Sequence, residues 1–140
     1  VSNLKKWLDE TLYGYLPDKV KNQIAHKRML LEQRYSSAGA LTDSTGWGWQ
    51  DLGALWVPLE YEVFGAIVWG TPGWSEGQAV QYPIFANTYL SRIKGAGNGG
   101  SRCHWWLASV RSGNSTNACN VNNNGNANNW NASNSNRVPV

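Results

Sequence analysis

The C-terminal part of this sequence contains no acidic side chain. All nine Asp and Glu residues lie in residues 1–76, whereas residues 77–140 hold five of the twelve Lys and Arg residues. The first part therefore has seven cations against nine acids, a formal charge of −2, and the second part has a charge of +5. Five scattered cations do not form the clustered basic patch that tracks a phosphate backbone. We therefore expect a surface of low charge and no nucleic-acid partner.

Cysteine and histidine are also scarce, which argues against a metal site and against nucleophilic catalysis. Cys103 and Cys119 are the only cysteines, and they do not have metal-site spacing with His26 and His104. Cys103 and His104 are adjacent, so their side chains diverge on a strand, and no carboxylate lies near them in the sequence. We expect no enzymatic activity, no metal and no cofactor. The two thiols could form one disulfide or stay as a half-buried pair.

Two further features have a structural explanation. Glu60 and Glu62 could supply paired carboxylates for glycoside chemistry, but they sit at a predicted helix start, where acids interact favourably with the helix dipole. The Gly-rich stretch at 95–100 is not set between a strand and a helix. It therefore predicts a plain loop and not a phosphate-binding loop.

Long apolar runs are missing. No segment approaches the ~20 consecutive apolar residues that span a bilayer, so we expect no membrane insertion. The length suits one domain over residues 1–140, and nine Trp with six Tyr are too many for a disordered chain. No signal-like segment is present, and the first residue is Val1 and not Met. We therefore expect the C-terminal domain of a longer protein.

The N-terminal half predicts two helices followed by strands. Apolar residues at helical spacing predict a first helix over 3–16 and a second, shorter helix over 19–24. The bulky, alternating segment 26–35 predicts a strand. Residues 36–53 are rich in Gly, Ser and Thr and predict a loop, whereas the compact apolar segment 54–59 predicts a further strand.

The middle of the chain predicts short helices between long loops. The segment "LEYEVFG" at 59–65 predicts a helix that ends on its glycine, and a loop follows to about Tyr82. A Pro at its first position favours a helix over 83–93. The strongly apolar segment 104–110 predicts a central strand.

Asparagine is the residue that this chain has in excess. Twelve of its sixteen asparagines fall between Asn114 and Asn136. Asn124 and Gly125 form one of the strongest short hairpin signals, because both tolerate positive φ. Small apolar residues alternate with Asn before this turn, so the Asn side chains are expected to point outward, and 135–140 predicts a final strand. The element order therefore predicts an α+β fold with short antiparallel strands and long irregular loops.

A surface of this composition suits recognition. Each Asn amide offers one acceptor oxygen and two donors on a short side chain, as antibody paratopes exploit. Three tryptophans lie in predicted loops, where they either join this surface or fill a loop-dense core: Trp47, Trp49 and Trp74. Three others are expected in the core: Trp56, Trp105 and Trp106. Trp130, among polar neighbours, is either an exposed anchor or the pin of the hairpin.

Several segments together resemble a known family. They are "WLDETLY" with "LPDKVKNQI", "VPLEYEVFG", "YPIFANTYL", "WWLASV" and the terminal "NVNNNGNANNWNASNSN" with "VP". On these segments the chain resembles a C-type-lectin-like domain of the DUF6273 type over residues 1–140, most strongly over 103–139. The resemblance implies a C-type-lectin-like fold with two N-terminal helices. It also implies a variable protein of a diversity-generating retroelement, as found in gut bacteria and their phages.

Such a retroelement copies a template repeat with a reverse transcriptase that misincorporates at adenines, and the product replaces the 3′ end of the gene. Every Asn codon begins with two adenines, so changing them gives many residue types and never a stop codon. The resemblance therefore implies that residues 103–140 are a variable region. Its predicted ligand-binding positions are Asn114, Asn117, Asn120, Asn122, Asn123, Asn124, Asn126, Asn128, Asn129, Trp130, Asn131, Asn134 and Asn136.

The sequence departs from the pattern of related domains in two respects. Many relatives carry Arg-Pro near the end, where this chain has "RVPV". Calcium-dependent sugar-binding lectins use carboxylates to coordinate the ion, and none follows Glu76 in this chain. We therefore carry over neither a calcium site nor a sugar site.

The function implied by the resemblance is hypervariable ligand binding. The partner would be a protein or a glycan on a cell surface, bound by a phage tail or decoration protein on the virion surface, or by a protein on the bacterial cell surface. The domain could form a homo-oligomer through a parent fibre or virion protein. Two alternatives stay open: a fixed-sequence carbohydrate- or cell-wall-binding module, and a virion structural or assembly domain.

Overall fold

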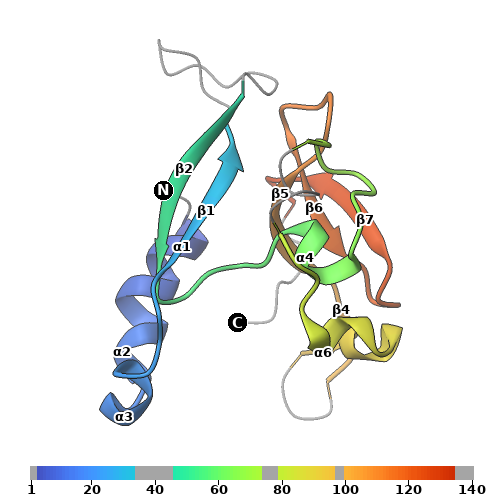
Figure 1. The fold of residues 1–140 in the computed structure, drawn as a ribbon. Helices are drawn as coiled ribbons and strands as arrows, with labels where there is room; N and C mark the ends of the chain where they lie inside the picture. The colour runs from blue at the N-terminus through green and yellow to red at the C-terminus, as the bar shows by residue number, and fades with distance from the viewer. Residues whose placement is uncertain (1–2, 34–45, 74–78, 97–99, 135–140) are drawn as a thin grey trace.

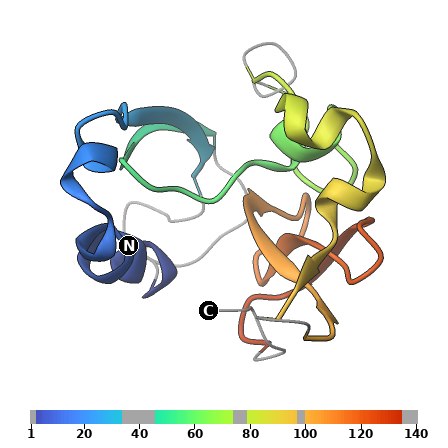
Figure 2. The ribbon, with the colours of Figure 1, turned by 90° about the horizontal axis from the view of Figure 1, so that it is seen from below.

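A computed structural model describes residues 3–33, 46–73, 79–96 and 100–134. It has a mixed α+β architecture in two halves that lie side by side (Figure 1). One half consists of the N-terminal helix and a two-stranded ribbon. The other consists of a three-stranded sheet, covered on one face by short helices, and an extended segment joins the halves (Figure 2).

The N-terminal helix runs without interruption for 13 residues through α1 (Asn3–Trp7), the π-helical η1 (Leu8–Leu12) and α2 (Tyr13–Tyr15). It ends at Leu16, whose extended ψ of 137° is the conformation that a following proline favours. The predicted first helix is therefore confirmed. The predicted second helix is reduced to one turn, α3 (Asp18–Lys21).

Two strands form the N-terminal ribbon, and one of them was not predicted. β1 (Lys27–Glu32) confirms the predicted strand and pairs antiparallel with β2 (Trp47–Gly53). The prediction of a loop over 36–53 is wrong from Trp47 onward, because Gly residues weakened a strand signal that pairing with β1 restores. The predicted strand at 54–59 is also wrong, since this extended segment lies in no sheet.

The short helices cover the C-terminal sheet. α4 (Glu60–Phe64) ends on Gly65, whose φ of 68° is left-handed, as its sequence predicted. The helix predicted over 83–93 is instead split into α6 (Pro83–Ala86) and the 3₁₀-helix η2 (Tyr89–Arg92). Thr88 breaks it, because its backbone is extended and its hydroxyl accepts the N–H of Leu90 (3.2 Å) to cap the second turn.

The C-terminal sheet has the strand order β5-β6-β7, all antiparallel: β5 (Trp105–Val110), β6 (Asn117–Val121) and β7 (Ala127–Asn131). A small ladder of β3 (Lys94–Gly95) and β4 (Arg102–Cys103) precedes it. The strand predicted at 104–110 is confirmed, but β6 is the central strand. The final strand predicted at 135–140 lies outside the described residues. The main core cluster of this half comprises Val63, Phe85, Leu107, Cys119 and Val121.

A buried carboxylate ties the loop after α4 to the sheet. Glu60 is 0% exposed, and its carboxylate accepts the backbone N–H groups of Val68 (3.1 Å), Trp69 (3.0 Å) and Gly70 (2.8 Å). The backbone N–H of Glu60 donates to Ser109 Oγ on β5 (2.9 Å). Glu60 therefore satisfies three buried or half-buried donors that the irregular loop could not satisfy by itself.

The neighbouring buried acid joins the two halves. Glu62 caps α4 by accepting the N–H of Leu59 (2.9 Å), and it pairs with the ammonium of Lys27 on β1. The hydroxyl of Tyr82 donates to Glu62 (2.9 Å) and receives bonds from Lys27 (2.6 Å) and from the indole of Trp56 (3.3 Å). The helix start predicted at these acids is confirmed, and both carboxylates make specific contacts beyond an interaction with the helix dipole.

Replacing Glu60 by Gln is expected to destabilise the domain. The amide keeps one oxygen and places an NH₂ group against backbone donors, so we expect the free energy of unfolding to fall by about 2 kcal/mol. Chemical denaturation measures this change. The exposed Glu10→Gln is the control and should stay within about 0.5 kcal/mol of the wild type. Equal stability of the two variants would contradict the anchoring role of Glu60.

Candidate functional site

The Asn-rich segment forms a hairpin, as predicted, but with a different turn. β6 and β7 pair from Asn117 with Asn131 to Val121 with Ala127. The N–H of Gly125 donates to the carbonyl of Asn122 (2.9 Å), and only Gly residues have positive φ in the described part of the chain. The loop is therefore a type I turn followed by a left-handed glycine, and Asn124 keeps an ordinary backbone conformation.

The tip of this hairpin is held against η2. Gly125 is buried, and the side chain of Arg92 donates from Nε to its carbonyl (2.9 Å). A Cβ on Gly125 would lie 2.9 Å from the carbonyl oxygen of Tyr89. The indole of Trp105 on β5 in turn donates to the carbonyl of Arg92 (2.8 Å). The backbone at the tip is thus fixed in part by contacts from outside the Asn-rich segment.

Three predicted binding residues are exposed at this tip: Asn123, Asn124 and Asn126. Asn131 at the other end of β7 is also exposed. The expected outward orientation holds for these residues, and the three at the tip extend from a backbone that Gly125 and Arg92 fix.

Other asparagines use their side chains to shape loops. The Oδ1 of Asn122 accepts the N–H groups of Asn124 (2.9 Å) and Asn126 (3.0 Å). Asn114 accepts the N–H of Thr116 (3.0 Å), and Asn131 accepts that of Ser133 (3.0 Å). These are Asx turns, in which the amide oxygen replaces a backbone acceptor. The sequence pattern predicts a turn, but it does not separate these asparagines from those whose side chains take no part in the turn.

Half-buried asparagines contact one another along the strands. Asn117 donates from Nδ2 to Oδ1 of Asn129 across the hairpin (2.9 Å). Asn128 accepts the N–H of the next residue (2.8 Å). Asn134 is half-buried, and its backbone N–H donates to the carbonyl of Asn131 (2.9 Å). Asn136 lies outside the described residues.

Asn120 is the exception to the outward orientation, and the prediction is wrong there. It is 1% exposed, and neither Oδ1 nor Nδ2 has a hydrogen-bond partner among the residues that the structure describes. Cys119 and Val121 face the main core, and successive side chains of a strand point to opposite faces, so Asn120 faces the other side of the sheet. There it is paired with Trp106 on β5 and with Asn128 on β7. That second face is also covered, which is why alternation did not expose the side chain.

An aromatic cluster occupies this second face. The rings of His104 and Trp130 stack with centroids 3.9 Å apart, and Trp106 meets Trp130 edge-on at 6.5 Å. The Nδ1 of His104 is buried, and no group in the described ranges forms a hydrogen bond with it. Trp130 is half-buried, so the contacts favour its interpretation as the pin of the hairpin.

The remaining tryptophans divide differently from the expectation. Trp49 on β2 is 55% exposed, Trp47 is half-buried, and Trp74 lies outside the described residues. The three expected in the core are all half-buried: Trp56, Trp105 and Trp106. Trp105 packs against the main core cluster, as expected. Trp69, which the sequence did not single out, is 38% exposed and donates from its indole to the carbonyl of Ala127 on β7 (3.3 Å). No local pattern could reveal this contact.

The two cysteines are both buried and no disulfide joins them, so the disulfide alternative is not realised. Cys103 lies on β4, where its thiol donates to the carbonyl of Lys94 (3.2 Å), and Cys119 lies on β6. Within the described ranges, no cluster of three or more His, Cys, Asp or Glu side chains could hold a metal ion. In the same ranges, no helix is both long and apolar enough to cross a bilayer.

Comparison with known proteins identifies the family. The family profile described as "Domain of unknown function (DUF6273)" matches residues 1–140. The chain belongs to the DUF6273 family. No curated protein and no solved structure matches it. The DUF6273 assignment therefore covers the whole chain, including the Asn-rich hairpin.

Substitution of Gly125 tests how firmly this DUF6273 domain holds the hairpin tip. Gly125→Ala adds a Cβ at positive φ and 2.9 Å from a backbone oxygen, so we expect a loss of about 2–3 kcal/mol in the free energy of unfolding. Gly113→Ala is the matched control, because Gly113 also has positive φ but open space around it, and it should cost about 1 kcal/mol. Equal losses in denaturant titrations would show that the tip is not closely packed.

The two kinds of asparagine can be separated by substitution. Asn122→Ala removes the acceptor of two backbone N–H groups, so we expect a loss of about 1–2 kcal/mol. Asn123→Ala, one residue away and exposed, should change stability by less than about 0.5 kcal/mol. Thermal unfolding followed by circular dichroism compares the pair. A larger loss from Asn123→Ala would contradict the assignment.

Proposed function

We propose that this DUF6273 domain is a ligand-binding domain with a C-type-lectin-like scaffold. Its Asn-rich hairpin surface is diversified by a retroelement, so that different copies recognise different proteins or glycans on cell surfaces. The domain acts on a virion or on the bacterial surface. One observation carries the proposal: the hairpin tip is fixed by Arg92 and Gly125, while Asn123, Asn124 and Asn126 are exposed on it.

A diversified surface has to accept many side chains without losing its backbone. At the tip, the positioning contacts come from η2, from the backbone of Gly125 and from Oδ1 of Asn122. A prearranged backbone also lowers the entropy cost of binding, because less of the surface must be ordered on contact. The codons of the exposed Asn residues supply the adenines that a retroelement changes. Fixed backbone and replaceable side chains therefore coincide at the same three positions.

The proposal also ranks the predicted positions. Variation at Asn123, Asn124 and Asn126 should change binding alone. Variation at Asn122 or Asn114 should change loop geometry as well, because both side chains accept backbone N–H groups. Functional diversity is therefore expected to be best tolerated at the tip.

A pair of display libraries tests this proposal. One library varies the adenines of the codons for Asn123, Asn124 and Asn126, and a matched library varies those for Asn114, Asn122 and Asn131. We expect most tip variants to resist protease and to yield binders for several unrelated purified cell-surface proteins and glycans. The matched library should contain more protease-sensitive members.

Two results would count against diversified binding. One is a tip library that folds but yields no binder for any target in the panel. The other is a gene neighbourhood that holds neither a reverse transcriptase gene nor a near-repeat differing at adenines, which would remove the diversification mechanism and leave a domain of fixed sequence.

Trp69 favours a second candidate, a carbohydrate-binding module of fixed sequence. Its exposed indole lies beside β7, and the guanidinium of Arg111 stands 5.6 Å from the ring centre. Exposed aromatic faces with nearby hydrogen-bonding groups suit sugar rings. Glycan-array binding by the unmodified sequence, lost in Trp69→Ala and kept in Asn123→Ala, would favour this candidate over the first.

A further inference from the structure

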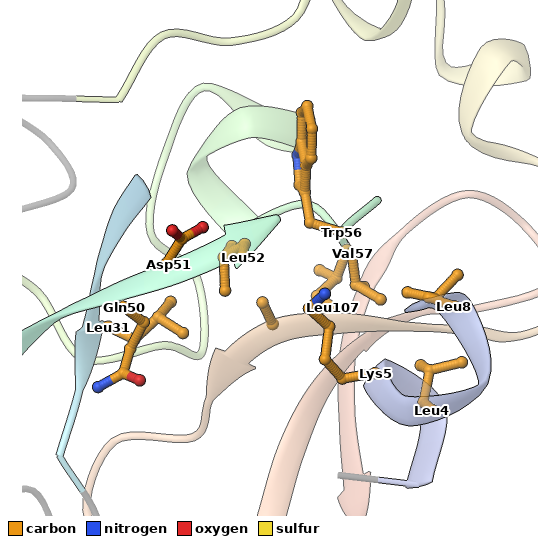
Figure 3. Close-up of a pocket in the computed structure, with 11 residues that line it drawn as sticks. Leu4, Lys5, Leu8, Leu31, Gln50, Asp51, Leu52, Trp56, Val57 and Leu107 are labelled. Carbon is orange, nitrogen blue, oxygen red and sulfur yellow. The ribbon is translucent and has the colours of Figure 1, made fainter. Parts of the chain in front are cut away.

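An apolar cavity of about 370 Å³ lies between the two halves of the molecule, away from the hairpin tip. Figure 3 shows Leu4 and Leu8 of the N-terminal helix on one side and Leu31 and Leu52 of the ribbon on the other. Leu107 of β5 also lines the cavity. The volume falls within the range of small-molecule sites, and the lining suits an apolar body.

A second, more polar cavity of about 530 Å³ adjoins the first. The two share Lys5 and Asp51, which therefore stand between them. Asp9, Tyr13 and His26 also line the second cavity. The apolar cavity thus has a more polar neighbour, called the vestibule, and the two meet at these two charged side chains.

The charges of this vestibule favour a cation. Among the described residues that line it, the carboxylates are Asp9 and Asp51, and the permanently charged cation is Lys5, which is paired with Asp9. Asp51 is exposed and accepts the N–H of Gly53 (2.8 Å). With histidine neutral, the described lining residues carry one net negative charge, and Arg28, the cross-strand partner of Asp51, lies outside this lining with its guanidinium over the ring of Trp49. The lining therefore favours a cationic group over an anionic one.

We propose that these two adjoining cavities together bind a small amphipathic amine. Its apolar body fills the cavity between Leu8 and Leu52, and its ammonium lies in the vestibule beside Asp51. The site uses the N-terminal half and β5, so it is separate from the hairpin and does not depend on the function proposed above. Burial of the apolar body supplies affinity, and Asp51 selects the sign of the head group.

Isothermal titration calorimetry of the full chain tests this proposal with three probes of equal chain length: octylamine, 1-octanol and octanoate. We expect octylamine to bind about fivefold more tightly than 1-octanol, and octanoate to bind most weakly. Asp51→Asn should reduce octylamine binding to the level of 1-octanol and leave 1-octanol unchanged. Asp18→Asn is the matched control, because Asp18 is 93% exposed and outside both cavities, and it should preserve the preference.

Substitution of a residue that lines the apolar cavity tests whether the probes bind there. Leu52→Phe enlarges a lining side chain and should weaken all three probes, and Val57→Leu serves the same purpose if the larger ring prevents folding. Undiminished binding in a folded wall variant would overturn the location. Binding of none of the probes to the wild type would overturn the site. Two results would overturn the role of Asp51. One is octanoate binding as tightly as octylamine, and the other is an equal loss of octylamine binding in Asp18→Asn and Asp51→Asn.

Discussion

The carboxylate of Glu60 is the interaction on which the C-terminal half depends. It takes up three backbone donors of the loop at Val68–Gly70, and the backbone N–H of the same residue bonds Ser109 on β5. Gly70 then forms a bridge with Arg111 at the end of that strand. A buried charge requires a full set of hydrogen bonds, so the loop and the strand are placed together.

The position of the hairpin follows from that of β5. The strand carries Trp105, whose indole bonds the carbonyl of Arg92, and Arg92 in turn bonds Gly125 at the tip. The second face of the sheet is secured separately, by the stacking of His104 on Trp130. The Asn-rich hairpin, whose sequence resembles low complexity, therefore rests on contacts from two distant segments, η2 and the adjacent residues His104 and Trp105. The two halves themselves are joined through Lys27, Glu62 and Tyr82.

Local signals in the sequence were sufficient for some elements and not for others. The start of α4 and its end at Gly65 could be predicted, because capping and left-handed glycine act within a few residues. β2 could not, since its glycines weaken the strand signal and its paired residues in β1 lie 15 to 26 positions away in the sequence. In the candidate site, the hairpin was predictable from Gly125. The burial of Asn120 and the proximity of Trp69 to β7 were not, because both arise from tertiary packing.

The Asx turns of Asn114, Asn122 and Asn131 limit the structural effect of some changes in their codons. Changing one adenine of an Asn codon to guanine gives Asp or Ser, and both side chains form the same kind of turn through an oxygen at a similar position. The most conservative outcomes of adenine exchange therefore alter charge or size while retaining the loop. At these positions the codon itself limits structural damage, and diversification of the hairpin would be partly protected against its own errors.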